Sequence, residues 1–94
     1  MAKPDFSVVW NRISTLAGEE FKTIRGLPFS YEVDRDSIIP SRTDYRLARA
    51  DFEAAYEHVP ISGPGRINDE VRGPSYIWAI LHDSRVARGD WHTQ

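Results

Sequence analysis

The segment RGPSYIWAILHD, residues 72–83, constrains the fold more than any other part of the chain because it places five large apolar side chains within six positions. They are Tyr76, Ile77, Trp78, Ile80 and Leu81. Proline favours the first position of a helix, so a helix is predicted to start at Pro74. At 3.6 residues per turn the three aliphatic side chains share one face and the two aromatic ones flank it. An arc this wide predicts a helix buried on three sides. The alternative is that Tyr76 or Trp78 stays exposed at a partner or ligand surface, where aromatic residues are enriched.

Two further helices follow from apolar spacing. The first spans Phe6 to Leu16, with Pro4 and Asp5 suited to its first turn and Gly18 to its end. Its apolar residues recur with the period of an amphipathic helix. The second predicted helix has the same apolar period and ends before a proline. The two sets are Phe6, Val9, Trp10, Ile13 and Leu16, and Phe52, Ala55, Tyr56 and Val59 before Pro60.

Strands are predicted between these helices. EFKTIRG and PFSYEVD form a pair with a turn at Gly26 and Pro28, and apolar and polar residues alternate in the second segment as a half-buried strand requires. The sequence DRDS, residues 34–37, is suited to a tight turn into SIIPS, and TDYRLA is a candidate fourth strand.

We therefore expect an α+β fold in which an antiparallel sheet of three to four strands is packed on one face by about three helices. Ninety-four residues that are 40% hydrophobic and 28% charged are typical of one domain, residues 1–94. Residues 86–94 are a candidate flexible tail unless Trp91 docks. The predicted core is Phe6, Val9, Trp10, Ile13, Phe29, Tyr31, Val33, Phe52, Tyr56, Ile77, Ile80 and Leu81.

Composition restricts the chemistry. The formal net charge of −2 lacks the positive excess of non-specific phosphate binders, and the absence of cysteine excludes disulfides, thiolate metal sites and cysteine nucleophiles. The first ten residues lack the apolar region of a signal peptide, and no run approaches the ~18 apolar residues of a membrane span. We expect a cytoplasmic protein with no membrane partner and no cofactor.

The segment from Pro60 to Pro74 contains three prolines and three glycines and loses regular periodicity, apart from a single turn near residues 67–71. Irregular segments of this length within domains are often functional. The candidate interface residues are Tyr76, Trp78, Arg66 and Arg72.

A second candidate site is a set of arginines. If residues 43–48 are extended, Arg42 and Arg46 project from one face while Tyr45 and Leu47 face the core. Arginines beside a helix N-terminus can hold a phosphate or carboxylate, although neighbouring acidic residues can instead pair with them. The anion or nucleic-acid candidates are Arg42, Arg46, Arg49, Arg66, Arg72 and Ser75.

The sequence patterns for a catalytic or metal site are less specific than those for a binding surface. Asp5 with Glu20 and Lys22 matches the short PD-(D/E)xK nuclease pattern, but Asp5 is placed where a helix begins and suits helix capping there. The acidic residues around the 34–37 turn lack calcium-loop spacing, and the histidines lack zinc spacing, so no metal site is predicted. These residues are Glu32, Asp34, Asp36 and Asp44, and His58, His82 and His92.

The segments FKTIRGLPFSYEV, PSRTDYRLARADFEAAYEHVP and SGPGRINDEVRGPSYIWAILHDSRV together resemble a group of small uncharacterised bacterial proteins encoded near mobile or accessory genes. The resemblance covers most of the chain after the first helix. It implies no activity and no catalytic residue. Related segments accompany restriction-type defence systems, which adds some weight to nucleic-acid binding.

The sequence leads us to expect a small non-catalytic binding module that acts through protein contacts and self-associates as a homo-oligomer. The motivation is an aromatic surface too large for a small domain to hide. The alternative is nucleic-acid or anionic-ligand binding through the arginines, and the third hypothesis is a metal-dependent nuclease.

Overall fold

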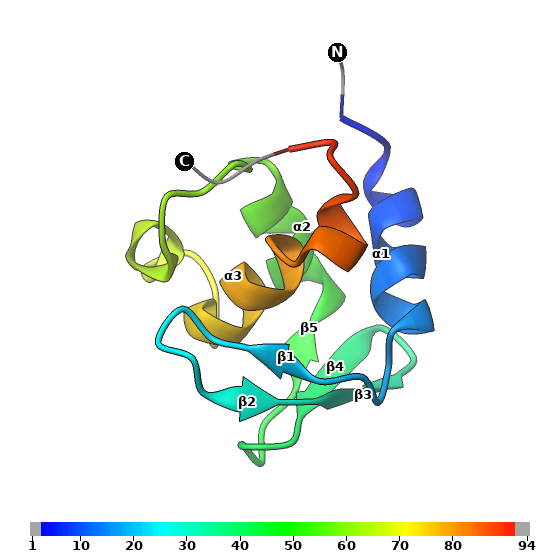
Figure 1. Ribbon diagram of the computed structural model, residues 1–94, viewed down its shortest axis with the longest axis vertical. Coiled ribbons are helices and arrows are strands. Elements are labelled where there is room, and N and C mark those ends of the chain that lie inside the picture. Colours follow the sequence, from blue (N-terminus) through cyan, green and yellow to red (C-terminus); the bar gives the residue numbers. More distant parts are fainter. Residues whose placement is uncertain (1–2, 92–94) are drawn as a thin grey trace.

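A computed structural model describes residues 3–91 and confirms the predicted α+β class, with four α-helices and two antiparallel sheets among those residues (Figure 1). In chain order the elements are α1 (Phe6–Thr15), β1 (Phe21–Lys22), β2 (Pro28–Phe29), β3 (Tyr31–Asp34), β4 (Ser37–Pro40), β5 (Leu47–Ala48), α2 (Arg49–Tyr56), the 3-10 helix η1 (Pro64–Ile67), α3 (Pro74–Leu81) and α4 (Ser84–Ala87).

The strands form two sheets, where a single sheet was expected. β1 pairs with β2, and β4 lies between β3 and β5. The sheets separate at Ser30 because the outer edge of β3 does not pair with β1. Instead, the N–H of Gly18 donates to the carbonyl of Tyr31 over 2.9 Å. The two sheets still share one core, since the Phe21 ring lies 5.1 Å from that of Tyr31 and 5.9 Å from that of Phe29.

Helix α1 forms as predicted and buries the apolar face that its spacing defined. Asp5 occupies the N-cap position, but its side chain makes no capping hydrogen bond there. The backbone carbonyl of Asp5 instead accepts from the N–H of Val8 over 2.9 Å. The first helix is therefore stabilised mainly by packing of its apolar face rather than by its cap.

Helix α3 lies in the middle of the molecule, between the other helices and the β1–β2 hairpin (Figure 1). It contacts η1, α2, α4 and β1, and Ile77, Ile80 and Leu81 are fully buried. Its two flanking aromatic residues, Tyr76 and Trp78, are partly buried against the core. The breadth of the apolar arc thus reflects a helix covered on several sides, as the sequence indicated.

The C-terminal segment packs onto the domain as far as Trp91, which is the docking that the sequence left open for residues 86–94. Val86 and Ala87 are buried on α4, and Trp91 is 5% exposed. The Trp91 indole N–H donates to the carbonyl of Leu81 over 2.8 Å, and its ring meets the ring of Tyr56 edge-on. Docking of Trp91 is the physical reason for this order. Residues 92–94 lie outside the described residues.

Two side chains expected in the core are more exposed than predicted. Val33 is only partly buried, because β3 is an edge strand. Tyr45 is 36% exposed because the chain becomes a strand only at Leu47, which is buried as expected. The core also contains residues outside the predicted core list: Phe21, Ile38, Leu47, Ala55, Val59, Ile61, Ile67, Val71, Ala79, Val86, Ala87 and Trp91.

Replacing Trp91 with alanine should lower the free energy of unfolding by about 3–5 kcal/mol, because a buried ring and its hydrogen bond are lost together. Chemical denaturation of the wild type and the W91A variant measures this. The W91F variant is the control, since it keeps most of the packing and should lose much less. A loss within about 0.5 kcal/mol for W91A, which is typical of a surface substitution, would contradict docking of the C-terminal segment.

Candidate functional site

The β1–β2 turn, η1 and the first turn of α3 enclose a groove of about 440 Å³. We name it the hairpin–helix groove. Its lining residues are Thr23, Ile24, Arg25, Leu27, Pro64, Ser75 and Tyr76. The first four come from the turn and the last two from α3, so the groove joins segments that lie about 50 residues apart in sequence. Figure 1 shows this turn beside the N-terminal end of α3.

The turn between β1 and β2 holds two aliphatic side chains out of the core. Thr23 closes the turn, since its backbone N–H donates to the Leu27 carbonyl over 3.0 Å and its Oγ1 accepts from the Leu27 N–H over 3.1 Å. Gly26 adopts a φ of +85°, a left-handed conformation that favours glycine. Ile24 and Leu27 are consequently 53% and 51% exposed, the highest values among the large hydrophobic residues described.

Tyr76 contributes the aromatic wall of the groove. Its ring meets Phe29 edge-on with centroids 5.0 Å apart, so the hairpin and α3 are in direct contact. Gly73, with a φ of +64°, starts α3 close to β5, where an added Cβ would lie 2.7 Å from a methyl carbon of Leu47. The same Cβ would be 3.5 Å from the ring of Tyr45, so that exposed aromatic side chain lies at the same end of α3.

Pro64, which also lines the groove, belongs to the 60–74 segment, and this segment is held to α3 and its C-cap residue by two hydrogen bonds. The Trp78 indole N–H donates to the Ile61 carbonyl over 2.8 Å, and the Ile61 N–H donates to Nε2 of His82 over 2.9 Å. The Trp78 and His82 rings stack with centroids 4.9 Å apart. The indole N–H of Trp78 is therefore engaged within the chain.

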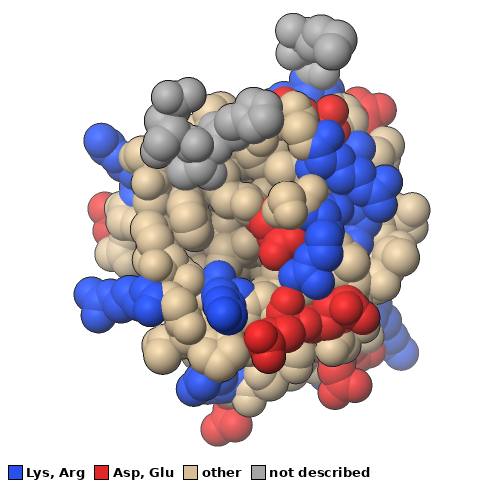
Figure 2. Space-filling model, viewed as in Figure 1, with Lys and Arg blue, Asp and Glu red and all other residues tan. Residues whose placement is uncertain are grey.

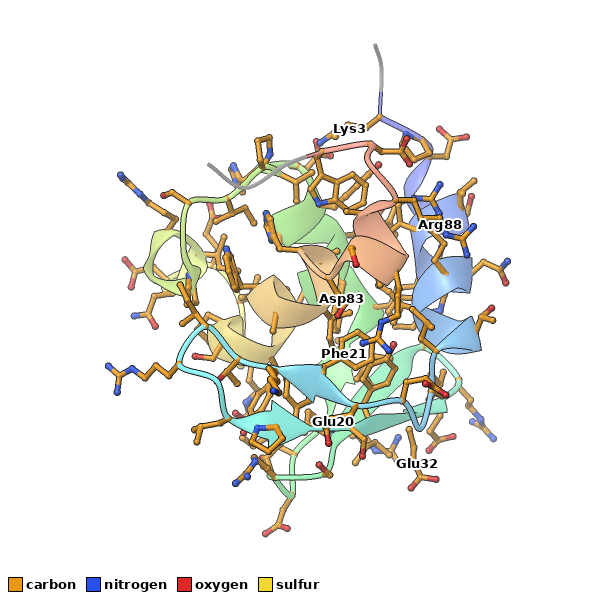
Figure 3. The ribbon with its side chains drawn as sticks, in the orientation of Figure 1. Lys3, Glu20, Phe21, Glu32, Asp83 and Arg88 are labelled. Atoms are coloured by element: carbon orange, nitrogen blue, oxygen red, sulfur yellow. The ribbon has the colours of Figure 1, made fainter. Side chains whose placement is uncertain are left out.

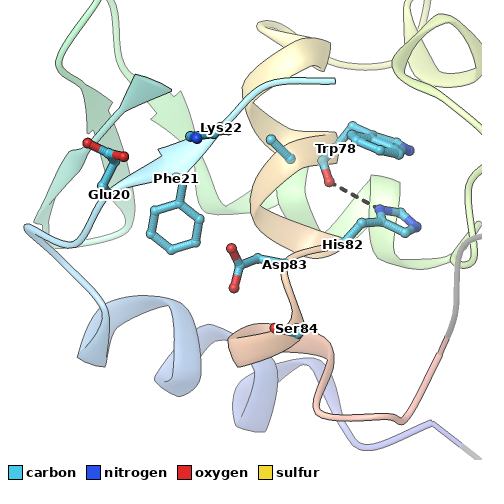
Figure 4. Close-up of a pocket in the computed structure, with 8 residues that line it drawn as sticks. Glu20, Phe21, Lys22, Trp78, His82, Asp83 and Ser84 are labelled. Atoms are coloured by element: carbon cyan, nitrogen blue, oxygen red, sulfur yellow. Dashed lines mark hydrogen bonds between the residues drawn. The ribbon is translucent and has the colours of Figure 1, made fainter. Parts of the chain in front are cut away.

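His82 is neutral in this arrangement. Nε2 accepts from Ile61, so the proton lies on Nδ1, which is 3.1 Å from the Trp78 carbonyl and donates to it (Figure 4). Burial lowers the pKa of His82, and the hydrogen bond to the Trp78 carbonyl offsets only part of that effect. Because both ring nitrogens are occupied, His82 acts as a structural residue that positions the loop.

Arg25 is the only charged residue that lines the groove. Within residues 3–91 its guanidinium group makes no hydrogen bond or ion pair with another side chain or carbonyl. Arg25, Ile24 and Leu27 were not among the candidate site residues predicted from the sequence. The available signal was the placement of two large aliphatic residues on either side of an Arg-Gly turn, where polar residues are usual.

The arginines chosen from the sequence each make their own contact within the chain. Arg42 donates to the Pro28 carbonyl over 2.5 Å and Arg46 pairs with Asp34 over 2.6 Å, because residues 43–46 do not continue β5. The other three make separate contacts within the chain. Arg49 lies over the rings of Phe6 and Trp10, Arg66 donates to Ser62, and Arg72 lies over Tyr45. Ser75 instead lines the hairpin–helix groove.

Figure 2 shows that the largest run of basic side chains on the viewed face covers α1 and α4. Arg88, labelled in Figure 3, lies in this region. Arg12 bonds to the Val86 carbonyl and to Asp90, both over distances below 3 Å. The guanidinium of Arg88 reaches the Arg85 carbonyl over 3.3 Å. These cations therefore hold the C-terminal segment.

A second cleft, of about 410 Å³, contains Glu20, Lys22 and Asp83 (Figure 4). The other residues that line it are Phe21, Trp78, Ala79, His82 and Ser84. The Asp83 carboxylate accepts three hydrogen bonds from Arg85. Burial favours a raised pKa for Asp83, but the bonds and charge of Arg85 prevail and lower it.

The nuclease pattern is not assembled around this cleft. Asp5 precedes α1 and Glu20 follows it, so the length of that helix separates the two carboxylates. No group of three or more His, Asp or Glu side chains that could hold a metal occurs within residues 3–91. Of the remaining candidates, His58 pairs with Glu70 over 2.9 Å, Asp34 pairs with Arg46, and His92 lies outside the described residues.

None of the helices in the described part of the chain is long and apolar enough to cross a membrane. Comparison with known proteins finds no matching family model, no matching curated protein and no matching solved structure.

Neutral His82 predicts a pH dependence of stability. Its pKa is lowered in the folded state, so the unfolded chain binds more protons between the folded pKa and the ordinary value of 6.5. The titration of His82 should leave the free energy of unfolding constant above pH 6.5. It should lower the free energy of unfolding as the pH falls from 6.5 toward the folded-state pKa. Urea titrations at a series of pH values measure the slope.

The H82Q variant should be less stable by about 1–3 kcal/mol at pH 7.5, because the buried Ile61 N–H loses its acceptor, and its stability should depend less on pH between 4.5 and 6.5. The H58Q variant serves as a control for a histidine at an exposed ion pair. An unchanged slope in H82Q would show that His82 is not the neutral acceptor described.

Proposed function

We propose that this protein is a small non-catalytic binding module that acts through protein contacts made at the hairpin–helix groove. The observation that carries the proposal is the pair Ile24 and Leu27, each more than half exposed on a turn that is closed by its own hydrogen bonds. A large apolar side chain held in water without a core contact favours a surface that is covered by a partner.

The exposed apolar residues are concentrated at one end of the molecule. Of the four large hydrophobic residues described as exposed, Ile24, Leu27 and Tyr45 lie at the N-terminal end of α3, and only Val8 lies elsewhere, on α1. Partly buried Tyr76 adds an aromatic anchor between the turn and the helix. Tyrosine, arginine and exposed aliphatic side chains together are typical of the central part of protein interfaces.

The expected partner contact is non-obligate. The accessible surface of the chain is 5658 Å², close to the ~5,500 Å² expected for a folded monomer of this mass. Its core contains no buried charged residue that would require a partner. Self-association, which the sequence led us to expect, stays a prediction and would take the form of a weak contact between folded monomers.

Nucleic-acid binding is supported less well, because five of the predicted arginines make separate contacts within the chain. A phosphate-binding surface gains affinity from several free cations acting together. Its signature, an affinity that falls steeply with salt, distinguishes it from an apolar protein contact.

Weak self-contact through the groove should be visible by NMR as the protein concentration is raised to the millimolar range. Amide shifts that depend on concentration should cluster at residues 23–27, Pro64–Ile67 and the first turn of α3. The L27D variant should reduce them at least about fivefold, because burying an unpaired carboxylate opposes the contact.

The V8D variant is the matched control, since Val8 is 45% exposed but lies on α1. It should leave the concentration dependence of the groove unchanged. Shifts centred on Val8, or no concentration dependence in any variant, would contradict self-association through the groove.

A further inference from the structure

We infer that the hairpin–helix groove recognises a peptide segment of another protein in which a large apolar side chain stands next to an aspartate or glutamate. The inference rests on the proposed function and deepens it by naming the chemistry of the partner. It combines two features of the groove: its apolar walls and Arg25, a cation without a hydrogen-bond or ion-pair partner among residues 3–91.

The apolar part of the ligand is set by the walls. The apolar lining consists of Ile24 and Leu27 from the turn, Pro64 from η1 and the Tyr76 ring from α3. The groove volume of about 440 Å³ is sufficient for one large side chain and its flanking backbone. Covering these walls removes apolar surface from water, which supplies the main part of the affinity.

The acidic part of the ligand is set by Arg25. No aspartate or glutamate is among the residues that line the groove, so the cation has no internal competitor there. A guanidinium group binds a carboxylate through two parallel hydrogen bonds, and such charge-assisted bonds are strongest where water is excluded. The hydroxyl group of Ser75, on the same lining, provides a further donor.

The same features disfavour the other occupants. A symmetric contact between two copies would bring their Arg25 side chains together, and like charges opposed across an interface cost affinity, so self-contact through the groove is expected to be weaker than binding of an acidic peptide. A nucleic acid would place phosphates against Ile24 and Leu27, which offer it no hydrogen bond, while Arg25 alone neutralises few charges.

The test uses a displayed library of random twelve-residue peptides selected on the wild-type chain, with counter-selection on L27D. We expect enrichment of sequences with Leu, Ile, Phe, Trp or Met adjacent to Asp or Glu. The enriched peptide is then synthesised with a fluorescent label, and its affinity is measured by anisotropy for the wild type and the variants.

The R25D variant should weaken binding of this peptide at least tenfold, and replacing the acidic residue of the peptide with its amide should weaken binding to the wild type by a similar factor. The R35D variant is matched in charge change, because Arg35 occupies the β3–β4 turn on the other side of the molecule (Figure 1). Aspartate tolerates the positive φ of 58° found there. R35D and V8D should retain the wild-type affinity within about twofold.

Other outcomes overturn the inference in distinguishable ways. Peptides that depend on Leu27 but bind R25D and R35D equally would refute the acidic partner and leave the proposed protein-contact function in place. If no peptide is enriched, the acidic peptide is refuted, and concentration-dependent shifts lost in L27D would then identify a second copy as the occupant. Salt-sensitive binding of a labelled oligonucleotide that R25D abolishes would assign the groove to nucleic acid, and both proposals would fail.

Discussion

The two hydrogen bonds between Ile61 and the side chains of Trp78 and His82 are the contact on which the arrangement of the groove depends. They satisfy both the carbonyl and the N–H of one loop residue with groups four residues apart on α3. Because these partners are on one helix face, the loop is held in register with α3. Pro64 and Tyr76 then both line the groove.

A second set of contacts fixes the frame behind the groove. Arg85 binds the carboxylate of Asp83, donates to the Glu20 carbonyl over 2.7 Å and lies 4.3 Å above the Phe21 ring. This places β1 against the junction of α3 and α4.

The hydroxyl of Tyr31 donates to the Ile13 carbonyl over 2.6 Å and so joins the second sheet to α1. Burial raises the pKa of Tyr31, so it remains a donor at physiological pH. The groove is therefore built on elements with fixed relative positions, which limits the entropy lost when a partner binds.

The buried faces of the longer helices could be predicted from the sequence, whereas isolated buried positions such as Phe21 could not. Helix α1 and helix α3 were predicted because several turns of apolar spacing identify the buried face. β1 is two residues long, so Phe21 provides a single buried position with no period to detect. Trp91 is buried by tertiary contacts with Leu81 and Tyr56 that no local pattern reveals.

The candidate site was predicted only in part. Tyr76, Ser75 and the 60–74 segment were selected from sequence and lie on the groove, whereas Trp78 is engaged with Ile61. Ile24, Leu27 and Arg25 were missed because the turn that exposes them depends on the hydrogen bonds of Thr23, and apolar residues in a strand-like segment are expected to be buried. The arginines were selected as a set from local spacing, which does not reveal the separate tertiary contact that each of them makes.

The central claim is that Ile24 and Leu27 contact the apolar side chain of a partner. The most direct measurement is intermolecular nuclear Overhauser enhancement between the methyl groups of the isotope-labelled chain and an unlabelled acidic–apolar peptide at saturating concentration. The account predicts enhancements from the Ile24 and Leu27 methyl groups to that side chain, and none from the exposed methyl groups of Val8 on α1. Enhancements at Val8, with none at Ile24 and Leu27, would contradict it.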